Sequence, residues 1–129
     1  MGERLPPPDD DDVIPIVSVN RVVMVARSQV RWVKANGDYI QLHTTKRSYL
    51  LRQSLTSLEA RWREHGFARI HRSYMVFIPL VTKLWKNCSS WVVHLGSGPG
   101  AVDLPISRRE LHKFKLRWMN EYRRGNETS

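Results

Sequence analysis

The sequence predicts a mainly β fold of the α+β class, an antiparallel β meander with one short helix and a C-terminal helix. Short runs of β-branched and aromatic residues recur from residue 22 onward, which is typical of strands. The pair Asn36-Gly37 separates two of these runs and supplies the positive φ angles of a tight hairpin turn. Apolar residues recur at helical spacing in residues 55–62 and 107–122. With 129 residues and 41% hydrophobic side chains, the chain can bury one core, so we expect a single domain.

An acidic segment rich in Pro and Asp opens the chain. Three consecutive prolines end at Pro8, and four consecutive aspartates follow them up to Asp12. Such a segment repels itself and cannot pack. We therefore predict that residues 1–16 are a tail or linker, that residues 17–122 form the domain, and that residues 123–129 are a frayed C-terminal tail.

Strands are predicted in both halves of the domain. Those of the first half are Val22–Ala26, Val30–Ala35, Tyr39–Thr44 and Arg47–Arg52. Those of the second half are the end of a mixed segment, Phe67–Phe77, and then Val81–Trp85, Trp91–Leu95 and Ala101–Leu104.

The first predicted helix is short and amphipathic. Leu55, Leu58 and Trp62 fall at i, i+3 and i+7, which places them on one face. Ser54 or Thr56 is available as the N-cap.

The second predicted helix begins at Ser107. Ser107 and Glu110 have the spacing of a capping box, in which a hydroxyl and a carboxylate bond the free N–H groups of a helix start. The apolar residues that follow at helical spacing are Leu111, Phe114, Trp118 and Tyr122.

The charge of the body indicates a polyanionic partner. The whole chain carries +9, and residues 1–12 carry −4 because Glu3 and Asp9 to Asp12 face only Arg4, which leaves +13 on residues 13–129. A body so basic and without a catalytic cluster is best explained by nucleic acid. The alternative is a ribosome-like or merely soluble basic domain.

Enzymatic, metal and cofactor sites are not predicted. Ser73 and His71 are two positions apart and lack a nearby acidic orienter. The single cysteine, Cys88, excludes an internal disulfide and a multi-cysteine zinc site, and the five histidines lack paired ligand spacing. The glycine-rich segment of residues 96–100 lacks the Lys-Ser/Thr ending of a phosphate loop. We therefore expect no enzyme activity, no metal and no cofactor.

A cytoplasmic location without membrane association is expected. No apolar run approaches the roughly 20 residues that span a bilayer. The N-terminus is polar and does not have the pattern of an export signal.

The start of the second helix is a candidate phosphate or base contact. Its free N–H groups and macrodipole already make this end positive, so Arg108 and Arg109 are locally unfavourable there. A phosphate or a guanine edge would complete such a site. The alternative is that both side chains reach solvent or pair with Glu110.

A second basic cluster lies in residues 69–74. Its apolar members are expected to anchor the segment while its polar members are presented. Arg72 is the candidate for base contact, because an arginine can reach both acceptors of guanine. Arg69, His71 and Ser73 suit phosphate oxygens. For His71, a purely structural hydrogen bond is an equal alternative.

Four segments, taken together and in order, resemble the LytTR DNA-binding domain, the output module of many bacterial response regulators of the LytR/AlgR/AgrA kind. They are WVKANGDYIQLHT (32–44), YLLRQSLTSLE (49–59), GFARIHRSYMV (66–76) and LPISRRELHKF (104–114). The resemblance covers about residues 17–115. One departure is Phe77, where the family commonly has Asn; an aromatic residue there suits packing rather than turn capping.

The resemblance implies an elongated, LytTR-like form of the predicted fold, in which loops enter successive major grooves of double-stranded DNA. By position, the three base-reading loops fall on Asn36 to Asp38, on Arg72 and on Arg108. Asp38 is unfavourable near DNA unless it accepts from a cytosine amino group. The residues then expected mostly on phosphates are Lys34, Arg69, His71, Ser73 and Arg109.

The implied function is a sequence-specific transcription regulator, the output domain of a two-component response regulator. No receiver domain precedes residue 17, and the acidic tail looks like an interdomain linker, which favours a domain cut from a longer regulator over a stand-alone protein. Family members often occupy paired sites as dimers, whereas this chain has no heptad seam that would specify a homodimer.

Two other classes of function remain open. An RNA-binding or ribosome-associated basic β domain would stack unpaired bases on exposed aromatic residues, but the tryptophans fall in patterns that indicate burial. A protein-interaction module that holds an acidic partner is equally compatible with the charge. Duplex sequence preference would separate these classes.

Overall fold

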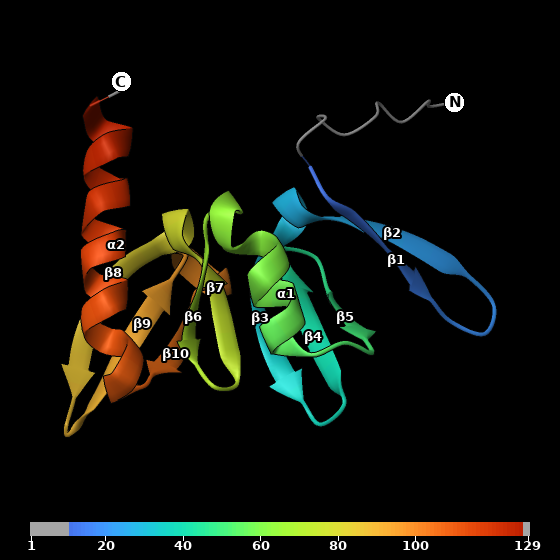
Figure 1. The fold of residues 1–129 in the computed structure, drawn as a ribbon, viewed down its shortest axis with the longest axis horizontal. Coiled ribbons are helices and arrows are strands. Elements are labelled where there is room, and N and C mark those ends of the chain that lie inside the picture. The colour runs from blue at the N-terminus through green and yellow to red at the C-terminus, as the bar shows by residue number, and fades with distance from the viewer. Residues whose placement is uncertain (1–10, 128–129) are drawn as a thin grey trace.

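The structure, a computed structural model, describes residues 11–127, in which ten strands and two α-helices follow one another along the molecule (Figure 1). The strands are β1 (Val13–Val17), β2 (Val22–Ala26), β3 (Val30–Asn36), β4 (Tyr39–Thr44), β5 (Ser48–Leu51), β6 (Phe67–His71), β7 (Tyr74–Phe77), β8 (Val81–Asn87), β9 (Ser90–Leu95) and β10 (Val102–Ile106). The helices are α1 (Leu55–Trp62) and α2 (Arg108–Glu127), and the 3-10 turns are η1 (Arg27–Gln29), η2 (Arg63–His65), η3 (Ile78–Leu80) and η4 (Gly98–Gly100).

The strands form three antiparallel sheets. β1 pairs with β2, the second sheet has the order β5-β4-β3-β7-β6, and the third has the order β10-β9-β8. The mainly β, antiparallel prediction with two helices is confirmed. The meander is interrupted once, because α1 carries the chain from β5 at one edge of the second sheet to β6 at the other.

The first core lies between α1 and one face of the five-stranded sheet. Leu58 and Trp62 of α1 are 0% and 1% exposed, as predicted from their spacing. They share a cluster with Val33 of β3 and Leu42 of β4, which point to the same face because they lie directly opposite each other in the pairing of the two strands. Ser54 caps α1, since its side chain accepts a 3.0 Å hydrogen bond from the backbone N–H of Ser57.

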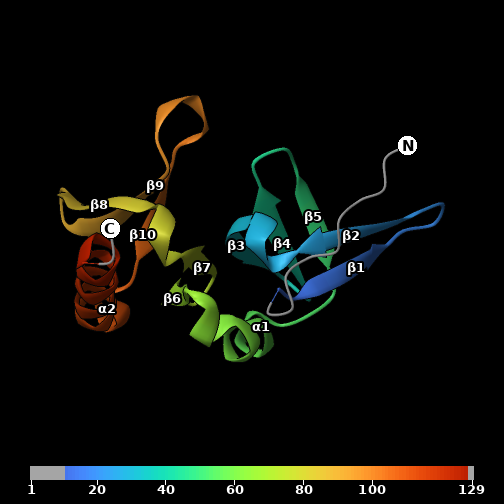
Figure 2. The same cartoon turned by 90° about the horizontal axis from the view of Figure 1, so that it is seen from above.

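The second core lies between α2, the three-stranded sheet and the other face of β6 and β7. Ile70 and Val76 supply that face, and Phe114 of α2 packs in the same cluster. Phe67 of β6 and Met75 of β7 belong to the first core, so this hairpin is buried on both sides. Figure 2 shows α1 and α2 on the same side of the sheets.

The beginning of the fold differs from the sequence prediction. Residues up to 16 were expected to be an unpacked tail, but β1 begins at Val13 and pairs with β2. Ile14 is 4% exposed in the first core. The carboxylate of Asp12 accepts hydrogen bonds from the side chains of Arg61 and Trp62 in α1. These bonds compensate the repulsion between Asp12 and the neighbouring aspartates. The rest of the predicted tail, residues 1–10, lies outside the described residues.

The end of α2 also differs. The helix was expected to fray after Tyr122, yet it continues to Glu127. Arg123 and Glu127 favour helical backbone, whereas Gly125 disfavours it, so intrinsic propensity alone does not explain the extension. Residues 128 and 129 lie outside the described residues.

Phe77 packs as the sequence suggested for an aromatic residue at this position. Its ring lies 5.1 Å from that of Phe67, centroid to centroid. Its Cε1 would stand 2.8 Å from a Cβ atom placed on Gly66, which has a φ of 91°. Gly66 is therefore required twice, by its backbone conformation and by the ring above it. Within residues 11–127, neither helix is both long and apolar enough to cross a bilayer.

Candidate nucleic-acid interface

Three exposed turns lie along one edge of the molecule: the β3–β4 turn, the β6–β7 turn and the start of α2 (Figure 1). Two backbone hydrogen bonds join them. The N–H of Ala35 donates to the carbonyl of Ser73 at 2.8 Å, and the N–H of Ser107 donates to the carbonyl of Ile70 at 2.9 Å. The middle turn is thus bonded to each of its neighbours, and the basic clusters that are far apart in the sequence come together.

The β3–β4 turn is the tight hairpin that the sequence predicted. Gly37 has a φ of 64°, and Asn36 pairs with Tyr39 across the turn. Asn36 and Asp38 are both exposed. Lys34, two positions before the turn on β3, is exposed and lies 6.0 Å from the centroid of the Tyr74 ring. A cation at this point is available to a phosphate.

The β6–β7 turn presents Arg72 to solvent and turns His71 inward. The backbone N–H of Ser73 donates to Nδ1 of His71 at 3.0 Å. Because an N–H can only donate, Nδ1 carries the lone pair, and the proton of the neutral ring lies on Nε2. His71 therefore has the structural hydrogen bond that the sequence left open, and Nε2 remains as a donor.

Arg69 is hydrogen-bonded within the protein. Its Nε donates to the carbonyl of His71 at 2.9 Å, and its Nη2 donates to the carbonyl of Arg72 at 2.6 Å. Its Nη1 donates to Oε1 of Glu59 at 3.1 Å. The side chain is 17% exposed. The guanidinium group of Arg69 thus faces protein acceptors.

Arg108 and Arg109 are exposed at the start of α2, one residue after the predicted start at Ser107. Glu110 does not pair with either of them: among the ion pairs recorded within residues 11–127, its partner is Lys113, at 3.9 Å. Within residues 11–127, no carboxylate is recorded in an ion pair with either guanidinium group, and both stand beside the positive end of a helix, an arrangement suited to an anion.

A cleft of about 410 Å³ lies where the second and third turns meet. Its lining includes Arg72 from the β6–β7 turn and Ser107 and Arg109 from the start of α2. Glu59 of α1 also lines it, paired with Arg69. This cleft shows that the two basic clusters form one surface.

Two features of this region were not predicted from the sequence. Glu59 has no signal beyond its place in a helical pattern, since its role depends on a partner in β6. The β8–β9 turn also lies at this edge (Figure 1), and the exposed Lys86 is the last residue but one of β8. The sequence placed Lys86 between two predicted strands but did not select it as a site residue, and β8 and β9 do pair there.

His43 lies behind the interface rather than in it. Its ring stacks on that of Trp32 with centroids 3.6 Å apart and planes 4° apart. Burial, and then the charges of Lys34 and Arg31, lower the pKa of His43 below its ordinary value. A neutral ring suits this stack.

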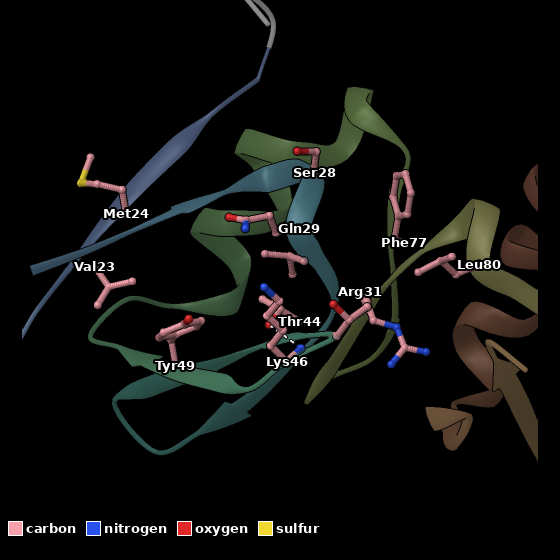
Figure 3. Close-up of a pocket in the computed structure, with 12 residues that line it drawn as sticks. Val23, Met24, Ser28, Gln29, Arg31, Thr44, Lys46, Tyr49, Phe77 and Leu80 are labelled. Carbon is pink, nitrogen blue, oxygen red and sulfur yellow. Dashed lines mark hydrogen bonds between the residues drawn. The ribbon is translucent and has the colours of Figure 1, made fainter. Parts of the chain in front are cut away.

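A second cavity, of about 460 Å³, lies away from the three turns, between β2, the start of β3 and the β4–β5 turn (Figure 3). Arg31, Lys46 and Tyr49 are among its lining residues. None of the site residues predicted from the sequence lines it. Within the described part of the chain, no cluster of three His, Cys, Asp or Glu side chains could hold a metal ion.

Comparisons with known proteins agree with this geometry. The family model of the LytTr DNA-binding domain matches residues 20–119. An uncharacterised response regulatory protein from Vibrio cholerae is 32% identical over 99 residues, which are 72% of this chain and 36% of the relative. A heme-containing CO-sensing transcriptional regulator from Paraburkholderia xenovorans is 29% identical over 114 residues, which are 88% of this chain and 42% of the relative.

A solved LytTr DNA-binding domain from Bacillus cereus has the same fold. It superposes with a TM-score of 0.68 at 17% sequence identity, over 81% of this chain and 94% of the other. The present chain spans less than half of the length of the two curated relatives, so most of each relative has no counterpart in it.

Proposed function

The chain belongs to the LytTR family of DNA-binding domains, and from this premise we propose that it is a sequence-specific transcription regulator that reads the major groove with three turns. The family is one of DNA-binding domains and not of enzymes. The observation that carries the proposal is the joining of the three exposed turns at one edge by the backbone bonds Ala35 to Ser73 and Ser107 to Ile70.

The exposed arginines contact two different parts of the DNA, the bases and the phosphate backbone. Arg72 and Arg108 read bases, because each extends from a turn into solvent and an arginine can bond both acceptors of guanine. Asn36 and Asp38 form the third reading loop, in which Asp38 accepts from a cytosine amino group. The groups that hold phosphates, and so fix the register of the protein on the duplex, are Lys34, His71, Ser73 and Arg109.

The larger protein is a response regulator. The relative from Vibrio cholerae is named as a response regulatory protein, and it extends well beyond the region shared with this chain. We therefore place a receiver domain upstream of this output domain, and a homodimer on paired sites. The protein would work in the cytoplasm, where its DNA is.

The test is selection of random duplex DNA by the purified 129-residue chain at near-physiological salt, followed by sequencing of the retained duplexes. We expect one enriched motif, repeated at about one helical turn if two copies bind together. Single-stranded RNA of random sequence serves as the competitor. Equal retention of all duplexes, or displacement by RNA at equal concentration, would contradict the proposal.

A matched pair of variants separates base readers from phosphate contacts. Arg108→Ala and Arg109→Ala remove one charge each from neighbouring exposed positions of the same helix end. Arg108→Ala should weaken binding to the selected duplex by about 1–3 kcal/mol and relax its sequence preference, whereas Arg109→Ala should weaken all duplexes alike.

A further inference from the structure

We propose that Arg69 is a positioning residue that, together with Glu59, holds the β6–β7 turn in the shape that aims Arg72 at DNA, and that it does not itself bind phosphate. The proposal rests on the proposed function, because it assigns Arg72 to base contact. It is carried by the hydrogen bonds of the Arg69 guanidinium group, which connect the β6–β7 turn to α1.

The guanidinium group of Arg69 donates hydrogen bonds to backbone carbonyls of the β6–β7 turn. Its Nε and Nη2 reach the carbonyls of His71 and Arg72, at 2.9 and 2.6 Å, so consecutive residues of the turn are bound by one rigid, planar group. The hydrogen bond from the Ser73 N–H to Nδ1 of His71 constrains the same turn further. With these bonds in place, the backbone that bears the Arg72 side chain has little freedom.

Helix α1 anchors the guanidinium group in turn. Nη1 donates to Glu59 Oε1 at 3.1 Å and to the hydroxyl of Thr56 at 3.4 Å. Glu59 is 27% exposed and Arg69 17% exposed, so this pair is partly shielded from solvent. The contact ties the reading turn to a helix whose buried face forms the first core, and a turn fixed to a rigid element positions its side chain more accurately than a free loop does.

A phosphate role suits Arg69 poorly. Three of its nitrogen atoms already donate to protein atoms, and Glu59 neutralises its charge. Arg72 and Arg109, which line the same cleft, are exposed instead. An approaching phosphate would therefore meet the exposed pair first.

The experiment uses two variants that leave the net charge unchanged. Arg69→Lys keeps the cation but loses the planar fork that bonds several acceptors at once. The double variant Arg69→Gln/Glu59→Gln removes the pair together. Arg47→Lys is the matched control, because Arg47 is exposed in the β4–β5 turn, outside the three turns of the interface. Affinity is measured by fluorescence anisotropy for the duplex that the selection yields and for a scrambled duplex, over a range of salt concentrations.

We expect both Arg69 variants to lower the ratio of selected to scrambled affinity by about tenfold, because the base contact of Arg72 is misplaced. Affinity for the scrambled duplex and its salt dependence should stay at the wild-type values, since no phosphate contact is lost. Arg47→Lys should keep the ratio and both affinities at the wild-type values. An unchanged ratio in Arg69→Lys, or an equal loss on both duplexes, would overturn the proposal.

A second measurement needs no DNA. ¹⁵N relaxation of the free protein reports the order parameters of the Arg72 and Ser73 amides, which should be near the rigid value of about 0.85 in the wild type and clearly lower in both Arg69 variants. Equal order parameters would overturn the proposal. If the wild-type chain prefers no duplex, the proposed function fails while this measurement still decides the role of Arg69. A thermal unfolding transition shows whether each Arg69 variant is folded. One folded variant is enough to test the proposal.

Discussion

The indole Nε1 of Trp62 donates a 2.8 Å hydrogen bond to Oδ2 of Asp12, which joins the last residue of α1 to the residue before β1. Trp62 is 1% exposed, so its N–H would lack a partner without this carboxylate. Arg61 donates to the other carboxylate oxygen at 2.6 Å. Asp12, the last residue of an aspartate run that looks like a linker in the sequence, is thus part of the folded structure.

We expect the protein to lose stability in acid because of Asp12. Burial acts to raise the pKa of Asp12, but hydrogen bonds from Arg61 and Trp62 and the nearby arginine charges hold it below the ordinary value of 3.8. A carboxyl with a lowered pKa in the folded state stabilises the protein fully above its unfolded-state pKa. This contribution is lost as the pH falls through the folded-state pKa.

Urea unfolding measures this effect. At neutral pH, Asp12→Ala should lower the free energy of unfolding by about 1–3 kcal/mol, since it leaves buried and charged donors unpaired. The difference from wild type should shrink as the pH falls below 3.8. Asp38→Asn in the exposed β3–β4 turn is the control. A difference that stays constant down to low pH would speak against this assignment.

His43 should make stability depend on pH in a second, milder range. Burial, followed by the charges of Lys34 and Arg31, lowers the pKa of His43 below 6.5, so the folded state disfavours the charged ring. The stabilisation is therefore present above 6.5 and is lost as the pH falls through the lowered pKa. His43→Phe cannot take up a proton and keeps an aromatic ring against Trp32. Its Tm should decline less than the wild-type Tm between about pH 7 and about pH 5, whereas exposed His65→Gln should follow the wild type.

Gly66 should tolerate substitution worse than another glycine of the same backbone conformation. Gly66→Ala places a Cβ atom 2.8 Å from the Phe77 ring at a φ of 91°, whereas Gly98, with a φ of 72°, has nothing within 4 Å of such an atom. Both variants lose about 1 kcal/mol through the left-handed backbone, and Gly66→Ala should lose a further 1–3 kcal/mol or so through overpacking. Equal free energies of unfolding for the two variants, measured in urea, would contradict this role of Phe77.

Arg72→Ala should change what the protein recognises more than how tightly it binds DNA in general. Arg72 is exposed at the middle turn, bonded to a neighbouring turn on either side through Ser73 and Ile70. The variant should lose about 1–3 kcal/mol on the selected duplex and tolerate substitutions at one base pair. Repeating the duplex selection with the variant checks this, and an unchanged motif would assign that base to another residue.

Local signals in the sequence were sufficient for most of the fold. The turn at Asn36-Gly37 and the helix that contains Leu55, Leu58 and Trp62 were predicted, because a positive φ and a 3.6-residue period are properties of the segments themselves. β1 was missed, since its apolar residues follow an acidic run and its pairing with β2 has no local signature. The order of the sheets likewise depends on contacts between distant segments.

The candidate site was predicted in part for the same reason. Charge and helix-end arguments selected Arg72 and Arg108, which the structure leaves exposed. They also selected Arg69, as a phosphate contact, because the sequence does not show that its guanidinium group faces protein acceptors. These acceptors include Glu59, ten positions earlier on α1, and two carbonyl groups whose directions the sequence does not specify.

The hairpin of β6 and β7 contributes to both hydrophobic cores, with Phe67 and Met75 in one and Ile70 and Val76 in the other. Neither half of the molecule can therefore lose its packing without exposing apolar surface that belongs to the other. The amides of this hairpin should exchange with solvent deuterium only when the whole chain opens, and the two halves should melt in one transition. The β6–β7 turn, which carries Arg72, thus belongs to the hairpin that we expect to unfold last.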